Sequence, residues 1–225
     1  MALFAISDLH LSFGTDKPMD VFGKRWENYE EKLKTNWNNL VSEEDMVIVN
    51  GDNSWATYLE DTFEDFNFIN SLNGTKLISK GNHDYWWSTM SKHVKWCEQN
   101  GFDTIKFLHN NYYMYGDTAI CGTRGWQLTK CDEEDLKVHN RELERLKISL
   151  DLAVKENPGN IIVALHYPPD EEFRHLIEGY NVDLCLFGHL HGLGFKDYKD
   201  YEENGIVYRL VSCDYLEFLP YKIMS

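Results

Sequence analysis

The chain has 225 residues, of which 43% are hydrophobic and 14% aromatic, enough apolar material for one domain with a full core. Its 37 acidic residues outnumber its 22 basic ones, and the resulting net charge of -15 argues against duplex nucleic acid as a partner. No apolar run approaches the ~18 residues of a membrane span. We therefore expect a single domain over residues 1–225 and no membrane partner.

The cysteines do not indicate a disulfide framework or a zinc-thiolate site. There are five, an odd number, and no two form a Cys-x-x-Cys pair. The chain begins Met1-Ala2-Leu3-Phe4 without a basic region, which is unlike a signal peptide. Reduced thiols are typical of the cytoplasm, and a soluble cytoplasmic protein is what we expect.

Short apolar runs and longer amphipathic segments follow one another in the first hundred residues. The apolar runs predict strands at 3–6, 46–49 and 77–78. Hydrophobic spacing predicts helices at 26–40, 59–72 and 85–99. A helix that connects two such strands would cover the sheet between them.

The middle of the chain has a different texture, with short β-like segments separated by turn signals such as Tyr115-Gly116-Asp117. These predict antiparallel strands at 107–108, 112–115 and 118–122. Helices are then predicted at 133–156 and 171–178, and strands at 161–165, 182–187, 206–212 and 221–224. No internal repeat, low-complexity tract or linker marks a second domain.

Five of the predicted strands end in Asp, Asn or His side chains. These are Asp8 and His10, then Asp52, then Asn82 and His83, then His166, then His189 and His191. A buried charge is costly unless something pairs with it, and neighbouring parallel strands bring their carboxyl ends together. We therefore expect these side chains to converge on cations. Oxygen and imidazole ligands without thiolate suit Mn²⁺, Fe or Zn²⁺ better than Ca²⁺.

The number of candidates favours two ions. Seven candidate ligands, His83 not counted, exceed one tetrahedral site, and a carboxylate such as Asp52 can bridge ions ~3.5–4 Å apart. Two divalent ions would carry four positive charges, of which Asp8 and Asp52 cancel only two, so the pocket would attract phosphate despite the net charge of -15. Hydroxide formed at the metals would be the nucleophile, because metal binding lowers the pKa of water towards ~7.

These motifs, in this order, resemble the signature of the calcineurin-like metallophosphoesterases. They are Asp8-x-His10, Gly51-Asp52, Gly81-Asn82-His83-Asp84, His166 and Gly188-His189-x-His191. The resemblance implies an α/β fold of four αββα layers, in which a two-sheet β-sandwich is flanked by helices and carries a dinuclear centre at its strand ends. It implies that one metal is bound by Asp8, His10, Asp52 and His191. It implies that the other is bound by Asp52, Asn82, His166 and His189.

The same resemblance implies that His83 is not a ligand. It would face the leaving-group oxygen as general acid, or help to stabilise the transition state, with Asp84 orienting its ring. Asn82 would also stabilise charge on the phosphoryl oxygens. Asn53 departs from the family pattern, since many relatives have an apolar residue there, and we expect this to alter only hydrogen bonding around the ligands.

Other polar and aromatic residues have simpler interpretations beside functional ones. Arg124 lies on a glycine-flanked loop, where it could bind a phosphate, although a structural salt bridge is favoured. Tyr85-Trp86-Trp87 could line a substrate pocket beside His83 or pack a helix start. Asp132 to Asp135 is interpreted as a solvated helix start. Surfaces or helix faces are the expected places of His93, His109, His139 and His175.

The sequence thus predicts a dinuclear metal-dependent phosphoesterase that hydrolyses a phosphomonoester or phosphodiester through a metal-bridging hydroxide. The chain lacks an obvious cap domain or basic groove, so a small phosphate ester is favoured as the substrate. A phosphoprotein substrate stays open as an alternative. So do a non-catalytic metal-binding scaffold of the same fold and a hydrolase of non-phosphate esters. The sequence predicts no oligomeric state.

Overall fold

Two sheets form the centre of the computed structural model, which describes residues 1–225. The first sheet has the order β11-β1-β2-β3-β4 and the second β5-β6-β7-β8-β10-β9. The strands of the first sheet are β1 Leu3–Ile6, β2 Met46–Asn50, β3 Thr75–Ser79, β4 Ile105–Phe107 and β11 Tyr221–Met224. Those of the second are β5 Tyr112–Tyr115, β6 Thr118–Thr123, β7 Asn160–Leu165, β8 Leu184–Phe187, β9 Tyr201–Glu203 and β10 Ile206–Leu210.

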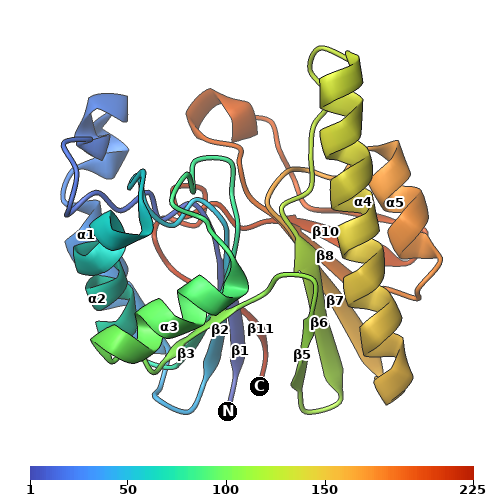
Figure 1. Ribbon diagram of the computed structural model, residues 1–225, viewed down its shortest axis with the longest axis horizontal. Helices are drawn as coiled ribbons and strands as arrows, with labels where there is room; N and C mark the ends of the chain where they lie inside the picture. The colour runs from blue at the N-terminus through green and yellow to red at the C-terminus, as the bar shows by residue number, and fades with distance from the viewer.

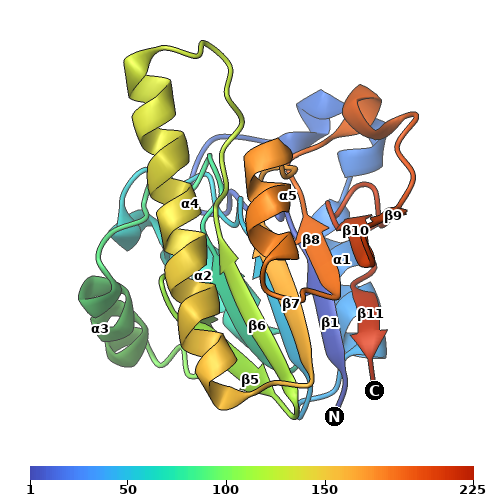
Figure 2. The ribbon, with the colours of Figure 1, turned by 90° about the vertical axis from the view of Figure 1, so that its right-hand side faces the viewer.

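Helices cover the outer face of each sheet (Figures 1 and 2). The first sheet is covered by α1 Tyr29–Leu40, α2 Phe63–Ser71 and α3 Met90–Asn100, and the second by α4 Glu133–Ala153 and α5 Glu171–Glu178. Short 3-10 turns are η1 Met19–Phe22, η2 Lys24–Trp26, η3 Leu59–Thr62, η4 Val154–Glu156 and η5 Gly192–Phe195. The predicted αββα sandwich is confirmed. None of the helices combines the length and apolar composition that a membrane crossing requires.

The alternation of side chains along the strands explains the layers. In β1, Phe4 and Ile6 belong to the core beneath the first set of helices, whereas Leu3 and Ala5 belong to the core between the sheets. Because successive side chains of a strand point to opposite faces, each strand contributes to both layers. The central strands are therefore apolar on both faces, as the sequence suggested.

Three predicted helices differ at their starts, and the one at 59–72 begins as the 3-10 turn η3 before α2. The predicted helix at 26–40 is interrupted because Asn28 has a left-handed backbone, with φ 52°, and α1 begins after it. The predicted helix at 85–99 begins only at Met90. Before it, the amides of Tyr85 and Trp87 bond the carbonyls of His83 and Asp84 in a turn.

The predicted antiparallel strand at 107–108 is wrong in its pairing. The strand is β4, and it lies parallel to β3 at the edge of the first sheet. Helix α3 supplies the crossover connection that a parallel pair requires. Only β5 and β6 of this region form the expected antiparallel hairpin.

The start of α4 is also more structured than a solvated acidic turn. Asp132 caps the helix by accepting a 2.9 Å hydrogen bond from the Asp135 amide. Asp135 itself is buried, and its carboxylate accepts from the Trp126 indole and from the amides of Thr129 and Lys130. This acidic cluster therefore fixes the loop before the helix rather than facing solvent alone.

Polar contacts join the two sheets at the carboxyl ends of their strands. Asn50, the last residue of β2, is buried, and its amide donates to the carbonyl of Leu165 at the end of β7. Its Oδ1 accepts a 3.0 Å hydrogen bond from the Ser79 hydroxyl. Beyond β1, the Ser7 amide donates to the Val211 carbonyl at 2.8 Å, which connects β1 to the chain that follows β10.

We expect Asn50→Leu to lower the free energy of unfolding by about 1–3 kcal/mol, because it removes a donor from a buried carbonyl without changing the side chain's size greatly. Urea denaturation would measure the loss. The control is Asn39→Ala on the exposed face of α1, which should change stability by less than about 0.5 kcal/mol. Equal stability of the Asn50→Leu protein and wild type would contradict this view of the sheet junction.

Candidate metal centre

The seven predicted ligands meet at one edge of the sandwich, beyond the carboxyl ends of five strands. The strands belong to both sheets: β1, β2 and β3 to the first, β7 and β8 to the second. Asp8 and His10 follow β1, Asp52 follows β2, Asn82 follows β3, His166 follows β7, and His189 and His191 follow β8. These ligands therefore come together because the two sheets meet here, and not because all five strands are neighbours in one sheet.

Sharp backbone turns aim these side chains into the site. Four of the seven have a left-handed backbone, with φ 62° at Asp8, 47° at His10, 52° at Asp52 and 70° at His189. Non-glycine residues seldom adopt this conformation, and such strain persists only where the surrounding structure imposes it.

Two glycines of the motifs are required by close approach. A β-carbon on Gly188 would collide with the Asp8 carboxylate and the Ser7 hydroxyl. A β-carbon on Gly81 would collide with the Asp52 carboxylate. Only glycine lets these loops pass so near the carboxylates.

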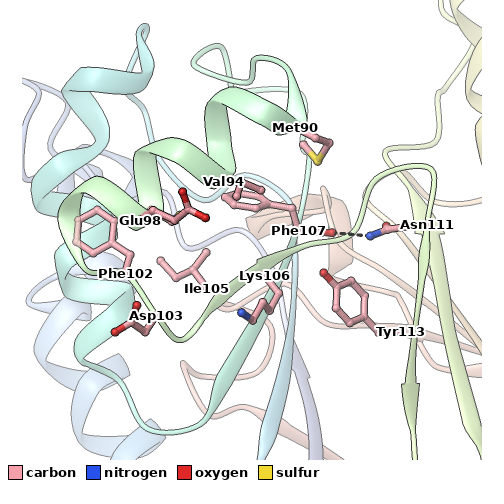
Figure 3. A pocket seen from close by; sticks show the side chains of 11 residues that line it. Met90, Val94, Glu98, Phe102, Asp103, Ile105, Lys106, Phe107, Asn111 and Tyr113 are labelled. Carbon is pink, nitrogen blue, oxygen red and sulfur yellow. Dashed lines mark hydrogen bonds between the residues drawn. The ribbon is translucent and has the colours of Figure 1, made fainter.

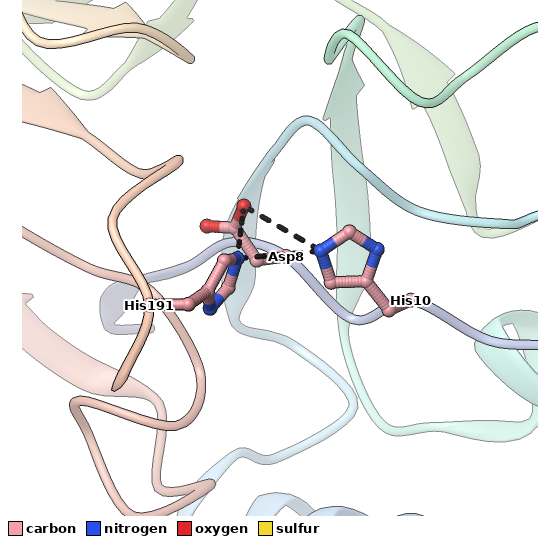
Figure 4. Close-up of side chains that lie close together, drawn as sticks. All are labelled: Asp8, His10 and His191. Carbon is pink, nitrogen blue, oxygen red and sulfur yellow. Dashed lines mark hydrogen bonds and ion pairs between the residues drawn. The ribbon is translucent and has the colours of Figure 1, made fainter. Parts of the chain in front are cut away.

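One group of potential ligands consists of Asp8, His10 and His191 (Figure 4). The Nε2 atoms of the two imidazoles are 3.3 Å apart, and His191 Nε2 lies 3.2 Å from Asp8 Oδ1. Asp52 Oδ2 approaches the same place, 3.7 Å from His10 Nε2. These are the four residues that the resemblance assigns to one metal.

The second group surrounds Asn82. Its Oδ1 lies 2.7 Å from His166 Nε2 and 2.9 Å from His189 Nδ1. Asp52 Oδ2 is 3.4 Å from His166 Nε2, so the same oxygen is near both groups. Asp8 also lies close to this group, with its Oδ1 3.9 Å from His166 Nδ1.

The donor chemistry of both groups fits divalent ions. Each presents carboxylate or amide oxygens and imidazole nitrogens within a few ångströms, and neither includes a thiolate. Imidazole nitrogens that converge on one point cannot satisfy one another as acceptors, whereas a cation satisfies all of them. This donor set suits Mn²⁺, Fe or Zn²⁺.

Neighbouring charges determine the protonation of the two carboxylates. Burial alone would raise the pKa of Asp8, but the imidazoles of His191, His166 and His10 outweigh it and hold the pKa well below its usual range. Burial likewise opposes ionisation of Asp52, and His166 and His10 again lower its pKa. Both carboxylates are therefore ionised at neutral pH.

The imidazoles divide into two kinds. Burial lowers the pKa of His10 and of His189 to about 4, so both rings are neutral near pH 7 and can coordinate a metal directly. Burial also disfavours the charged forms of His166 and His191. Nearby carboxylates outweigh the effect of burial at these two rings. Asp52 raises the pKa of His166 to about 9, and Asp8 raises the pKa of His191 to about 10.

His83 lies beside both groups but belongs to neither. Its amide donates to Asp52 Oδ1 at 2.8 Å, and its half-buried ring lies 4.4 Å from the ring of Trp55, between centroids. Its Nδ1 is 3.5 Å from the Tyr85 hydroxyl. Burial lowers the pKa of His83. This position is compatible with contact to a substrate rather than to a metal.

No hydrogen bond joins the Asp84 carboxylate to the His83 ring, which Asp84 was predicted to orient. The Asp84 carboxylate is buried and accepts from the amides of Gly81 at 2.7 Å, Asn53 at 2.8 Å and Asp52 at 3.0 Å. Burial raises its pKa, and the charge on Asp52 adds to this effect. Asp84 therefore connects the loops after β2 and β3, which carry Asp52 and Asn82.

Asn53 serves the same network. Its side-chain amide donates to Asp84 Oδ2 and to the Ser79 carbonyl, at 3.0 Å in each case. The Asn53 side chain thus donates to two residues that are not themselves candidate ligands.

The structure pairs Arg124 with Glu142, whose Oε1 lies 3.5 Å from its Nη2. The guanidinium also lies over the Trp126 ring, and neither of these partners is one of the seven ligands. The salt-bridge interpretation is therefore the one that the contacts favour. His93 and His139 are buried on helix faces, where they contact Ser88 and Asp170 instead of the ligands.

Asp214 is a residue of the site that the sequence interpretation missed. Its buried carboxylate lies 2.8 Å from His191 Nδ1 and accepts a 3.3 Å hydrogen bond from the Gly192 amide. Carboxylates in this position orient the imidazoles of metal sites. The available signal was that the strand predicted at 206–212 also ends near a carboxylate.

Pockets lie both at the site and away from it. One of about 290 Å³ is lined by His10, His83 and His191 together with apolar side chains. Another, of about 310 Å³, lies between α3 and β4 and is lined by none of the predicted site residues (Figure 3). The chemistry is therefore concentrated at the first pocket.

Solved structures share the fold of this chain at low sequence identity. One is a protein of unknown function from Aquifex aeolicus, which is 19% identical to this chain with a TM-score of 0.54. The match covers 98% of this chain and 95% of the Aquifex protein. The phosphopantetheinyl hydrolase of Mycobacterium tuberculosis is 12% identical with a TM-score of 0.59. The match covers 99% of this chain and 95% of the hydrolase. The protein TT1561 of Thermus thermophilus is 16% identical with a TM-score of 0.55. The match covers 92% of this chain and 87% of TT1561. At these identities the likeness concerns the fold alone.

The sequence itself determines the family. No curated protein matches it significantly. The model of the calcineurin-like phosphoesterase family matches residues 1–193, and this range contains every predicted ligand. The chain therefore belongs to the calcineurin-like phosphoesterase family of metal-dependent phosphoric ester hydrolases.

Proposed function

We propose that this protein is a dinuclear phosphoesterase that hydrolyses a small phosphomonoester or phosphodiester. The observation that carries the proposal is the position of Asp52, whose Oδ2 is 3.7 Å from His10 Nε2 in one group and 3.4 Å from His166 Nε2 in the other. A carboxylate between two sets of nitrogen and oxygen ligands is what a pair of ions about 3.5–4 Å apart requires.

Each set of ligands would hold one ion. Asp8, His10, Asp52 and His191 would hold the first. Asp52, Asn82, His166 and His189 would hold the second. When bound, the ions would supply a water of lowered pKa as nucleophile and would neutralise charge on the phosphoryl oxygens.

The remaining residues would position and protonate the substrate. When phosphorus is attacked, the bond from phosphorus to the ester oxygen would break, and that oxygen would take a proton from the protonated form of His83. The side chain of Asn82 would also stabilise the growing charge on the phosphoryl oxygens. Asp84 would act indirectly, by fixing the loops that carry Asp52 and Asn82.

A small ester suits the pocket and the charge of the chain. The pocket beside the ligands measures about 290 Å³, close to the lower end of small-molecule sites. The net charge of -15 disfavours duplex nucleic acid. A phosphoprotein is the alternative substrate, since a phosphorylated side chain can also enter a small open pocket.

We expect metal-stripped protein to lose hydrolysis of p-nitrophenyl phosphate and of bis-p-nitrophenyl phosphate by about 100-fold or more, and added Mn²⁺ to restore it. Release of p-nitrophenol measures both reactions. Faster cleavage of the diester would identify a phosphodiesterase, and faster cleavage of the monoester a phosphatase. A protein that binds two Mn²⁺ ions but cleaves neither ester would support the non-catalytic scaffold instead.

The second test concerns the proton donor. His83→Ala should lower kcat by about 10²–10⁴-fold without changing the metal content, because His83 lies outside both ligand groups. His175→Ala, on the exposed side of α5, is the matched control and should leave kcat unchanged. An unaltered kcat in the His83→Ala protein at full metal content would remove His83 from the mechanism.

A third test concerns Asp214, which we propose orients His191. Asp214→Ala should weaken binding of one of two Mn²⁺ ions by about 10–100-fold in calorimetric titration, and Asp214→Asn should recover part of the loss as it keeps an acceptor for Nδ1. Asp103→Ala, an exposed carboxylate between α3 and β4, is the control. Unchanged Mn²⁺ affinity in Asp214→Ala would limit Asp214 to a role in folding.

A further inference from the structure

One side of the candidate metal centre opens into a pocket of about 290 Å³ that is lined by three histidines, Gly192 and four hydrophobic residues. The rings of His10, His83 and His191 line its inner part. Its other walls are apolar side chains from the two 3-10 turns before α1 and from the loop after β2. They are Met19, Phe22, Trp26 and Trp55.

The two tryptophans form a fixed part of the wall. The Trp55 ring stacks on His10, with 4.9 Å between centroids and 22° between planes, and its Nε1 donates to Met19 Sδ at 3.2 Å. Trp26 is buried, and its ring packs at 5.1 Å from Tyr29 and 5.4 Å from Phe218. Both indoles are therefore held by packing before any ligand enters.

Phe22 forms the outer part of the wall. Its side chain is 67% exposed although it lines the pocket. The ammonium of the exposed Lys17 lies 4.7 Å from the centre of the Trp55 ring. Exposed aromatic surface beside a polar centre is a feature of ligand sites.

We propose that this pocket receives the leaving group of the substrate and that this group carries a planar aromatic ring a few atoms from the ester oxygen. The inference rests on the proposed function. His83 lines the pocket, so an ester oxygen that takes its proton has the rest of the leaving group inside the same pocket.

The chemistry of the walls selects among leaving groups. Apolar side chains cannot replace the hydrogen bonds that the hydroxyls of a sugar or polyol lose on burial, so such groups are disfavoured. Flat rings gain stacking contacts against tryptophan and phenylalanine. An aromatic alcohol of modest size therefore suits this pocket better than a polyol.

The test compares benzyl phosphate with ethyl phosphate, whose leaving alcohols have similar acidity, on Mn²⁺-loaded protein. If the protein prefers diesters, the methyl diesters of the same alcohols replace them. Wild type should favour the benzyl ester in kcat/KM. Phe22→Ala should lower the benzyl-to-ethyl ratio about tenfold, and Phe22→Tyr should restore it, because stacking on one aromatic side chain is commonly of that size.

Phe13→Ala is the matched control, since Phe13 is a half-exposed phenylalanine outside the pocket, packed 5.1 Å from Phe68. It should keep the wild-type ratio. Inhibition by benzylphosphonate and by ethylphosphonate gives a second readout in which no ester bond is cleaved, and Phe22→Ala should weaken only the benzyl compound.

Two results would overturn the inference while leaving the proposed function intact. One is an equal kcat/KM for the two esters in wild type, and the other is a benzyl-to-ethyl ratio of kcat/KM that is the same in wild type and Phe22→Ala. Absence of hydrolysis of any phosphate ester by the metal-loaded protein would overturn the proposed function and this inference with it. Binding of both phosphonates with equal strength would also count against an aromatic leaving group.

Discussion

Two carboxylates, Asp8 and Asp52, are buried side by side where the two sheets meet, with 0% and 1% of their surfaces exposed. Like charges buried together are costly unless cations stand near them. In the protein alone, His166 and His191 supply that charge, because the carboxylates raise their pKa to about 9 and about 10. Divalent ions would supply it more strongly. The left-handed turns and the closely approaching glycines of the site serve this arrangement.

The loops that carry the ligands are held by further buried carboxylates. Asp84 accepts amide hydrogen bonds from the loops after β2 and β3, and Asp214 contacts His191 and Gly192 after β8. The Cys213 thiol contacts the Asp8 carbonyl at 2.9 Å, so the segment after β10 also lies against the turn after β1. Segments from the whole length of the chain thus fix the geometry of one site, which matters because small displacements of reacting groups are costly in catalysis.

Much of the fold and the site could be predicted because their signals are local. A short apolar strand followed by Asp, Asn or His is visible within a few residues, and this located all seven candidate ligands. The partners of Asp84, Asp135 and Asp214 could not be located in this way. Their hydrogen bonds depend on how distant loops pack, and Asp84 stands next to His83 in sequence while its carboxylate points to Gly81 and Asp52. The parallel pairing of β4 depended likewise on the path of α3.

Under the proposed function, reactivity and selectivity would come from different parts of this structure. The candidate ligands follow strands whose hydrogen-bonded sheets hold them in place. The apolar wall comes largely from the short turns η1 and η2, which lie outside the sheets. Loops of this kind tolerate substitution better than the elements they connect. Under the proposed function, changes at Met19 or Phe22 would therefore alter which leaving group is accepted without displacing a candidate metal ligand. The two tryptophans differ from these residues, because Trp55 stacks on His10 and the Trp26 ring lies 5.8 Å from that of His191.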